Sequence, residues 1–342
     1  MNQPAVSIVM PVYNDETTLT ACLNSIWKQT FHDFELVVVD DGSNDSTPEL
    51  LGNQNDSRLI VVSIEKNGGI VNALNAGLSQ CHGTLIARMD GDDLMRPDRL
   101  EKQVHFMETN PHVDLCGSLV ALFCEAGTLS ANALKYMNWS NQLQSHEDIC
   151  ASIFMESPIM HPTFLGRREL FESLKGYEDH GWAEDYDFLL RAFLAGSKFG
   201  KIPEVLVDKR DSPERLSRVR AEYKRPAMFN AKVHYLLQSG LVSQDHYPVI
   251  FGTGPSGREL ARSLIASGIA VQRFVDNLQG PPDRTVMGIP ASHQQEPIAS
   301  WMPEDKHRVR ILLALSSESI ELIKSELRKQ GLQENREYFQ MI

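Results

Sequence analysis

Strand patterns that alternate with helical patterns limit the fold of this chain more than any other feature. The apolar runs cover residues 6–13, 34–39, 59–64 and 85–89. Between the first two runs, Leu19, Leu23 and Ile26 recur at helical spacing. Strands that are apolar at nearly every position are buried on both faces, and their alternation with helices is typical of a parallel sheet. We therefore predict an α/β fold with a mostly parallel sheet flanked by helices.

The fourth apolar run ends in a cluster of acids. Asp90, Asp92 and Asp93 follow it directly. Carboxylates this close raise one another's pKa, and a bound cation relieves their repulsion. Oxygen ligands suit Mg²⁺ or Mn²⁺, and Mg²⁺ is commonly held by one or two carboxylates plus substrate phosphates. Because open α/β sheets bind ligands at the carboxyl ends of strands, the cluster indicates a metal–diphosphate site. The alternative is an acidic turn that caps the helix following Arg96-Pro97.

Length and composition narrow the class of protein. The 342 residues predict two domains, and the net charge of −12 argues against non-specific binding to nucleic acid. No apolar run approaches the roughly 18–20 residues of a membrane span. The first residues lack the basic and apolar segments of a signal peptide, and the five cysteines lack the close pairs of a zinc site. We expect a cytoplasmic protein with reduced cysteines and no nucleic-acid partner.

Four motifs in the first part of the chain resemble the nucleotide-binding half of a family 2 glycosyltransferase with the GT-A fold. They are residues 9–14 (VMPVYN), 38–43 (VVDDGS), 67–69 (NGG) and 87–93 (ARMDGDD). The motifs occur in the family's order, and the resemblance covers roughly residues 5–235. One departure is visible in the helix after the glycine pair, where many relatives carry Arg and this chain has Ala73-Leu74-Asn75. That departure removes one contact to the diphosphate.

The resemblance implies a site for a nucleotide-diphosphate sugar, with a UDP-sugar favoured. Pro11 and Tyr13 would pack against the base, and Asp40 or Asp41 would accept a hydrogen bond from a uracil-type ring N–H. The alternative for the second pair is a simple turn. The ribose-contacting acid would be Asp90, and Mn²⁺ or Mg²⁺ would be bound by Asp92 together with Asp90. The remaining residues of the implied donor site are Asp15, Asn67, Gly69, Arg88 and His161. For His161, a buried structural role is an equal alternative.

A second motif of the same family lies at residues 181–191 (GWAEDYDFLLR). The resemblance implies that Asp185 takes the proton from the acceptor hydroxyl, with Glu184 as the second candidate or as a group that orients the acceptor. A transferase that attacks an anomeric carbon with a hydroxyl needs such a base. The alternative is that these acids only favour the N-terminus of a helix. One helical turn on, Asp187 and Arg191 are predicted to form a supporting pair.

A basic segment at residues 205–232 follows this motif. The segment includes Lys209. The resemblance implies that a loop here covers the diphosphate, and its candidate residues are Arg210, Arg215 and Ser217. A second interpretation is attraction to anionic lipid, with the protein peripheral at the inner face of the membrane and a lipid-linked acceptor. The third is a solvated helix face.

A glycine-rich turn opens a second α/β pattern near the C-terminus. Gly252, Gly254 and Gly257 form a G-x-G-x-x-G turn between a strand and a helix pattern. Asp276 ends the next strand, close to the roughly 20-residue offset of a ribose-binding acid. We therefore predict a small Rossmann-like domain over residues 241–342. A second nucleotide site at these four residues is one interpretation, and a structural or oligomerising role, consistent with a homo-oligomer, is the other.

Together these features predict a metal-dependent, inverting glycosyltransferase domain over residues 1–240. It would move a sugar from a nucleotide-diphosphate sugar to a saccharide or lipid-linked acceptor, in the synthesis of surface polysaccharide or glycoconjugate. A nucleotidyltransferase is one rival, but it usually carries a Gly-rich basic signature where this chain has PVYN at residues 11–14. A non-catalytic nucleotide-sensing scaffold predicts loss of the acids, and all are present. An oxidoreductase centred on Gly252 would lack a substrate domain.

Overall fold

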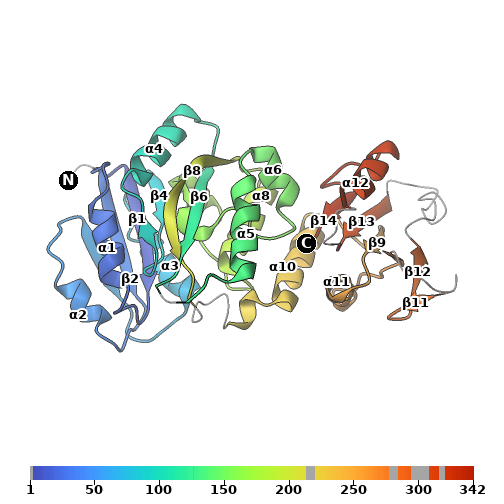
Figure 1. The fold of residues 1–342 in the computed structure, drawn as a ribbon, viewed down its shortest axis with the longest axis horizontal. Coiled ribbons are helices and arrows are strands. Elements are labelled where there is room, and N and C mark those ends of the chain that lie inside the picture. The colour runs from blue at the N-terminus through green and yellow to red at the C-terminus, as the bar shows by residue number, and fades with distance from the viewer. Residues whose placement is uncertain (1–2, 126, 213–219, 277–283, 294–307, 316–319) are drawn as a thin grey trace. The chain divides into compact units, whose positions relative to one another are not determined.

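Two compact units make up the chain (Figure 1). The computed structural model describes residues 3–125, 127–212, 220–276, 284–293, 308–315 and 320–342. The first unit comprises Met1–Cys150, Ser157–His180 and Glu184–Arg218, and the second comprises Ala151–Glu156, Gly181–Ala183 and Val219–Ile342. Helix α10 (Arg225–Gln238) belongs to the second unit, although it precedes the predicted boundary at residue 240. That the two parts are separate domains stays a prediction.

An eight-stranded sheet forms the centre of the first unit (Figure 1), in the order β3-β2-β1-β4-β7-β6-β8-β5. The strands are β1 (Val6–Val12), β2 (Phe34–Asp40), β3 (Leu59–Ser63), β4 (Leu85–Arg88), β5 (Leu94–Met95), β6 (Leu115–Phe123), β7 (Leu165–Arg167) and β8 (Phe199–Arg210). The first four strands in that order are parallel. Strand β7 is antiparallel to β4 and β6, whereas β8 is parallel to β6 and antiparallel to β5. The predicted mostly parallel sheet is therefore confirmed.

Both faces of this sheet are covered, which explains its near-continuous apolar strands. The helices before β8 are α1 (Leu19–Trp27), α2 (Thr47–Gly52), α3 (Ile70–Leu78), α4 (Arg99–Thr109), α5 (Ala131–Gln142), α6 (His146–Ser152), α7 (Arg168–Ser173) and α8 (Glu184–Leu194), with a 3-10 turn η1 at His161–Thr163. On one face of β1, Ile8 and Met10 share a buried cluster with Leu23 of α1. On the other face, a Cβ added to Gly77 of α3 would lie 2.8 Å from Val9. Neighbouring residues of β1 thus contact opposite helix layers.

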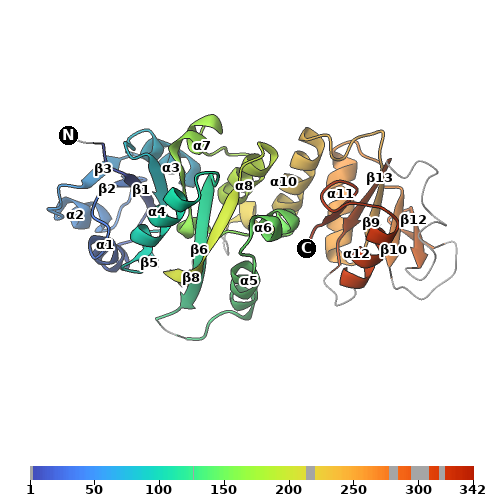
Figure 2. The same cartoon turned by 90° about the horizontal axis from the view of Figure 1, so that it is seen from above.

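The second unit contains a smaller sheet, drawn in orange to red in Figure 2. Its strand order is β11-β12-β10-β9-β13-β14. Its elements are α10, β9 (Tyr247–Phe251), α11 (Pro255–Ala266), β10 (Arg273–Asp276), β11 (Thr285–Val286), β12 (Ile289–His293), β13 (Val309–Leu313), α12 (Ile320–Lys329) and β14 (Tyr338–Gln340), after a 3-10 turn η2 at Ala221–Tyr223. Only the β11–β12 pairing is antiparallel among those described in this sheet. The parallel strands, with α11 between β9 and β10, form the predicted Rossmann-like module.

Among the described helices, none is both long and apolar enough to cross a bilayer.

Candidate active site

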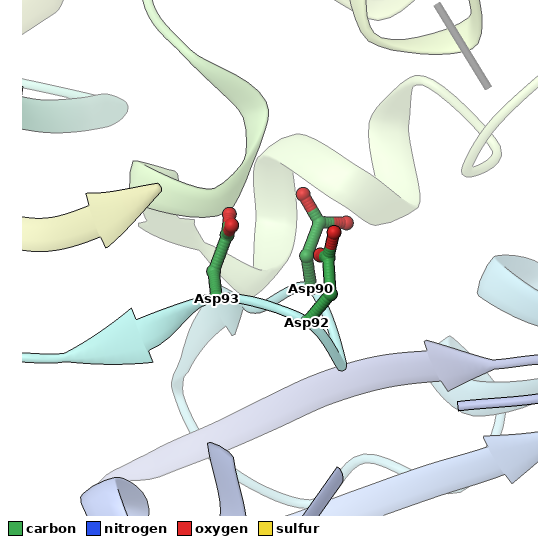
Figure 3. Close-up of side chains that lie close together, drawn as sticks. All are labelled: Asp90, Asp92 and Asp93. Atoms are coloured by element: carbon green, nitrogen blue, oxygen red, sulfur yellow. The ribbon is translucent and has the colours of Figure 1, made fainter. Parts of the chain in front are cut away.

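The loop after β4 brings three carboxylates together at the carboxyl end of the strand. Asp90, Asp92 and Asp93 each place an oxygen so that the three oxygens lie within 4.8 Å of one another. Figure 3 shows the three side chains projecting from one side of this loop. Strand β5 separates the cluster from α4, whose N-cap residue is Asp98. The acids therefore do not cap the helix after Arg96-Pro97, and that alternative is wrong.

Two cations neutralise part of the cluster. Arg88 forms an ion pair with Asp90, while the Lys209 ammonium lies 3.0 Å from Asp90 and 3.1 Å from Asp93. Burial opposes the ionisation of Asp90, but Arg88 and Lys209 outweigh it and hold the pKa of Asp90 well below its usual range. Burial holds the pKa of Asp93 above its usual range, although Lys209 acts in the opposite direction. Asp90 is therefore ionised at neutral pH and is already paired with protein cations.

The chemistry of the cluster suits a divalent cation, because its three acids offer hard carboxylate oxygens. Lys209 pairs with both Asp90 and Asp93, and the Asp92 carboxylate belongs to the same group of three acids. One or two carboxylates completed by phosphate oxygens and water is a common coordination of Mg²⁺. The sequence analysis placed all three acids in the cluster and named only Asp92 and Asp90 as metal ligands. The structure adds Asp93 to the set but buries its side chain fully.

The end of β8, which carries Lys209, also contacts the acidic loop through Arg210. The Arg210 N–H donates to Asp93 at 2.7 Å, and its Nε donates to the carbonyl of Asp92 at 2.8 Å. Lys209 and Arg210 therefore act on the loop itself, which sequence reasoning did not foresee. Arg215 and Ser217, the other candidates of the basic segment, lie outside the described residues.

The glycine pair at Gly68 and Gly69 is held by Asp41. One oxygen of Asp41 accepts from the N–H of Gly68 and the other accepts from that of Gly69, both at 2.9 Å. Asp40 accepts from the N–H of Ser43 at 3.0 Å through one of its oxygens. Both carboxylates are only 4% exposed. Of the two predicted base-contacting acids, Asp41 is thus committed to shaping the turn that carries Asn67 and Gly69, so Asp40 is the better candidate for the base.

The turn after β1 leaves Tyr13 exposed and buries much of Asp15. Tyr13 is 44% exposed, as a residue that packs against a base must be, and Pro11 lies just before it at the end of β1. Burial and the charge of Asp92 raise the pKa of Asp15 to about 7. A Cβ on Gly91 would lie 2.7 Å from the Asp15 carboxylate. Asp15, which the sequence analysis placed in the donor site without a specific contact, therefore lies against the acidic loop.

Helix α8 begins with the acids of the second motif. Glu184 is 4% exposed, and one of its oxygens lies 3.4 Å from Nδ1 of His161. The other ring nitrogen of His161 lies 2.8 Å from the hydroxyl of Tyr177. Burial and the charge of Arg88 lower the pKa of His161 to about 3, so its ring is neutral. The neutral ring of His161 thus lies between the Glu184 carboxylate and the Tyr177 hydroxyl, whereas Asp185 is less buried on the same first turn.

The predicted pair of Asp187 and Arg191 is present. Arg191 Nε lies 2.7 Å from the fully buried Asp187, and its two terminal nitrogens donate to the carbonyls of Leu174 and Gly176 at 2.8 and 3.0 Å. The pair therefore ties α8 to the segment that follows α7. Its role is to hold the helix that carries Asp185.

Sequence reasoning missed Arg99, a fully buried cation beneath the acidic loop. Its Nη2 donates to the carbonyls of Arg88 at 2.9 Å and Phe164 at 3.3 Å, and its Nε donates to Gln103 at 2.8 Å. Burial lowers the pKa of Arg99 to about 9. The only signal in the sequence was an Arg at the start of a helix, a position at which most side chains reach solvent.

We expect Arg99→Met to destabilise the protein by about 3 kcal/mol, because a hydrogen-bonded charged donor is lost and buried carbonyls lose a partner. The measurement is urea unfolding of the two proteins. Arg96→Met is the control, because Arg96 is half exposed and pairs only at the surface with Asp208. Equal midpoints for Arg99→Met and the unsubstituted chain would contradict this role.

The glycine turn of the second unit is tightly packed. Gly252 has φ +106°, and a Cβ on Gly257 would lie 1.9 Å from the carbonyl oxygen of Gly252. The Asp276 carboxylate accepts from the N–H and the hydroxyl of Thr253 at 2.7 and 2.6 Å. The glycines and Asp276 thus build the turn itself. A nucleotide site that includes Gly254 and these residues stays a prediction.

Known proteins match the chain in sequence. The profile of the family described as glycosyl transferase family 2 matches residues 7–175. The amylovoran biosynthesis glycosyltransferase AmsE of Erwinia amylovora is 34% identical, over 63% of this chain and 79% of its own length. An uncharacterized glycosyltransferase of Methanocaldococcus jannaschii is 33% identical, over 69% of this chain and 81% of its own length.

Solved structures share the fold at lower identity. Staphylococcus aureus TarS in complex with UDP-GlcNAc aligns with a TM-score of 0.54 and 20% identity, covering 76% of this chain and 71% of the other. The mannosyltransferase PcManGT of Pyrobaculum calidifontis, in complex with GDP-Man and Mn²⁺, aligns with a TM-score of 0.52 and 18% identity, covering 78% and 76%. The fold is that of the GT-A glycosyltransferases. The chain belongs to glycosyltransferase family 2.

Proposed function

We propose that this enzyme uses a divalent cation to transfer a sugar from a nucleotide-diphosphate sugar to an acceptor hydroxyl, with inversion at the anomeric carbon. The observation that carries the proposal is the group of three carboxylates at the end of β4. The acids of α8 supply a second chemical function on the same unit. A UDP-sugar is the favoured donor, since Asp40 is suited to a uracil-type N–H. The acceptor is a saccharide or a lipid-linked saccharide of a surface polysaccharide or glycoconjugate.

The relatives support this choice of substrates. The name of AmsE refers to amylovoran biosynthesis, TarS was solved with UDP-GlcNAc, and PcManGT was solved with GDP-Man and Mn²⁺. A nucleotide-diphosphate sugar is thus the donor type bound by both fold neighbours. They do not agree on the base, so the choice of uracil for this chain depends on Asp40.

In the proposed reaction, the acceptor oxygen attacks the anomeric carbon while the bond from that carbon to the diphosphate breaks. Asp185 takes the proton of the acceptor hydroxyl, and the nucleoside diphosphate departs. Asp92, with Asp90, would hold Mn²⁺ or Mg²⁺, which when bound neutralises the charge on the departing diphosphate. Asp90, fixed by Arg88, would contact the ribose. One displacement from the opposite side inverts the configuration.

Glu184 is better suited to positioning than to proton transfer. It is buried and lies beside the neutral ring of His161, which Tyr177 holds from the other side. A carboxylate fixed in this way can orient an acceptor hydroxyl toward Asp185. This arrangement favours Asp185 as the base and gives His161 a supporting role.

Calorimetry with nucleotide sugars tests the donor. We expect UDP-sugars to bind in the presence of Mn²⁺ and to lose most of their affinity in EDTA, with GDP-Man weaker. Analysis of the products separates the rivals: a glycosyltransferase releases nucleoside diphosphate, a nucleotidyltransferase forms or consumes pyrophosphate, and a sensing scaffold releases neither. Release of pyrophosphate would overturn the proposal.

Gly91→Ala tests the packing of the acidic loop. The added Cβ would meet the Asp15 carboxylate at 2.7 Å and Val12 at 2.8 Å, so the loop must shift. We expect the Kd of the donor to rise about tenfold, the effect of an overpacking cost of about 1.4 kcal/mol. Gly52→Ala is the matched control, because a Cβ there meets nothing within 4 Å. Unchanged donor affinity in Gly91→Ala would show that the loop position is not critical.

Peripheral attachment to the inner face of a membrane is a further proposal, and the structure limits which residues of the basic segment can contribute to it. Of the basic segment, Lys209 and Arg210 bind the acidic loop, and Lys232 is buried with its ammonium bonded to the carbonyls of Met155 and Met341 at 2.7 and 2.8 Å. These three cations are therefore not available to lipid headgroups. Binding to vesicles with anionic lipid would have to depend on other residues of the segment.

A further inference from the structure

The second unit contains a pocket of about 610 Å³ that the proposed reaction does not use. It lies over α10 and α11, which pack against each other, and Trp182 forms one wall. Figure 2 shows the two helices side by side. Pockets of this size are typical of small-molecule sites. We propose that it binds a neutral saccharide, and that this saccharide is part of the acceptor.

Aromatic side chains form one wall of this pocket. The rings of Trp182 and His234 lie 5.3 Å apart, and both pack against Tyr235, at 6.4 and 4.9 Å between ring centroids. Tyr235 is buried, with 1% exposure, whereas His234 is exposed and Trp182 is partly exposed. A buried ring thus fixes the orientation of the two that line the pocket. The apolar C–H face of a pyranose packs well on such a preformed aromatic surface.

Neutral polar groups form the other walls. The hydroxyl of Ser263 donates to the amide oxygen of Asn230 at 2.8 Å, which sets the orientation of that amide. Gln238 and Ser267 add a second amide and a second hydroxyl at the rim. Amides and hydroxyls both donate and accept, as the hydroxyls of a sugar do.

The charge of the lining argues for a neutral ligand. Of the described residues that line the pocket, none is Asp, Glu, Lys or Arg. A nucleotide or another phosphate ligand would find no cationic side chain among them. A saccharide without charged groups is therefore the ligand class that this set of residues recognises.

The position of Trp182 in the sequence connects the pocket to the acceptor. Trp182 stands three positions before Asp185. Three peptide steps span at most about 11 Å between Cα atoms, whatever the conformation of the chain. A saccharide on the Trp182 ring is therefore within a few sugar units of the proposed base. Naming this saccharide the acceptor rests on the proposed function, whereas the binding site itself does not.

The test measures binding of neutral disaccharides to the full-length protein by saturation-transfer NMR. The probes are maltose, lactose, diacetylchitobiose and mannobiose, with a glucuronic-acid disaccharide as the charged comparison. We expect at least one neutral probe to bind and the charged one to bind more weakly. Trp182→Ala should raise the Kd of the neutral probe about tenfold or more. No transfer to any neutral probe would overturn the proposal.

Two further variants distinguish loss of the binding site from unfolding of Trp182→Ala. Ser267→Trp fills the pocket from an exposed position, so it should block binding while leaving the thermal unfolding unchanged. Leu322→Trp, at a side chain that is 73% exposed and outside the lining of the pocket, is the matched control and should bind as the unsubstituted protein does. Equal saccharide affinity in Ser267→Trp and Leu322→Trp would contradict the site.

Calorimetry with UDP and Mn²⁺ on the same proteins separates the two proposals. The pocket variants should keep the nucleotide affinity, because none of the substituted residues belongs to the proposed donor site. Nucleotide binding without saccharide binding would overturn the pocket and leave the proposed function standing. Saccharide binding without nucleotide binding would overturn the proposed function, and with it the assignment of the saccharide as the acceptor.

Discussion

Asp92→Ala should lower the rate of sugar transfer at least about a thousandfold, because a cation at a departing diphosphate stabilises the transition state by several kcal/mol. Asp92 lies in the group of three carboxylates at the carboxyl end of β4, where the proposed cation would bind. The measurement is release of nucleoside diphosphate in Mn²⁺. The unsubstituted enzyme should lose activity to the same extent in EDTA and recover it when Mn²⁺ or Mg²⁺ is added. Asp33→Ala, at an exposed acid on the loop before β2, is the matched control.

The same substitution should not destabilise the fold. After burial, the charge of Asp92 is the main cause that raises the pKa of Asp15 to about 7. A carboxyl whose folded pKa is raised destabilises the protein as the pH rises above its unfolded value near 4, because the folded state then resists losing the proton. Removing Asp92 lowers that pKa and restores stability. Metal-free Asp92→Ala should therefore unfold at the same temperature as the unsubstituted protein, or higher, at pH 8.

Measuring both activity and thermal stability of Asp92→Ala distinguishes a chemical role of Asp92 from a structural one. A variant that is inactive and at least as stable has lost a chemical function and kept its fold. Full activity of the unsubstituted enzyme in EDTA would remove the metal from the mechanism. Loss of both activity and stability in Asp92→Ala would instead point to a structural role for Asp92.

The first sheet could be predicted because its signals are local. Each buried strand is a short apolar run, and Ile8 and Val9 show why, since neighbouring residues of β1 meet helices on opposite faces. The acids at the end of β4 were equally visible, because ligand sites in such sheets follow the carboxyl ends of strands. The second sheet was recognised from Gly252 and Gly257, which allow the close approach of strand and helix that the structure shows.

The partners of the acids could not be predicted, because they come from distant parts of the chain. Lys209 reaches Asp90 and Asp93 across more than a hundred positions, through the placement of β8 in the sheet. In the sequence, Lys209 belongs to the basic segment at residues 205–232, for which three interpretations were open. Tyr177 lies only 16 positions after His161, but it follows β7 and α7 in a segment outside the named helices and strands. Only tertiary packing distinguishes these residues from other surface cations and aromatics.

Asp15 shows how the nearest neighbour in space can differ from the one that the sequence suggests. From the sequence, Asp15 belonged to the implied donor site with no specific contact. Gly91 has no side chain, however, and the acidic loop packs directly against the Asp15 carboxylate. The absence of a Cβ at position 91 is what allows this approach, and a single sequence gives no sign of it.

Asp185→Asn should lower the turnover number by about 10²–10⁴-fold, the usual cost of losing a general base. The substitution keeps the shape of the side chain and removes its capacity to take a proton. The Kd of the donor, measured by calorimetry with Mn²⁺, should stay the same, because Asp185 acts on the acceptor. The logarithm of the turnover number of the unsubstituted enzyme should rise with pH until the base is ionised. That rise should be absent in Asp185→Asn.

Two neighbouring acids on α8 provide the comparison. Asp187→Asn breaks a buried ion pair with Arg191 and should cost about 3 kcal/mol of stability, yet it should keep the pH profile. Glu184→Gln keeps a polar group beside His161 and should raise the KM of the acceptor more than it lowers the turnover number. The three variants thus separate proton transfer, support of the helix and orientation of the acceptor. If Asp185→Asn kept normal turnover while Glu184→Gln lost both the turnover and the pH dependence, Glu184 would be the base, and the buried carboxylate beside His161 would be the reacting group.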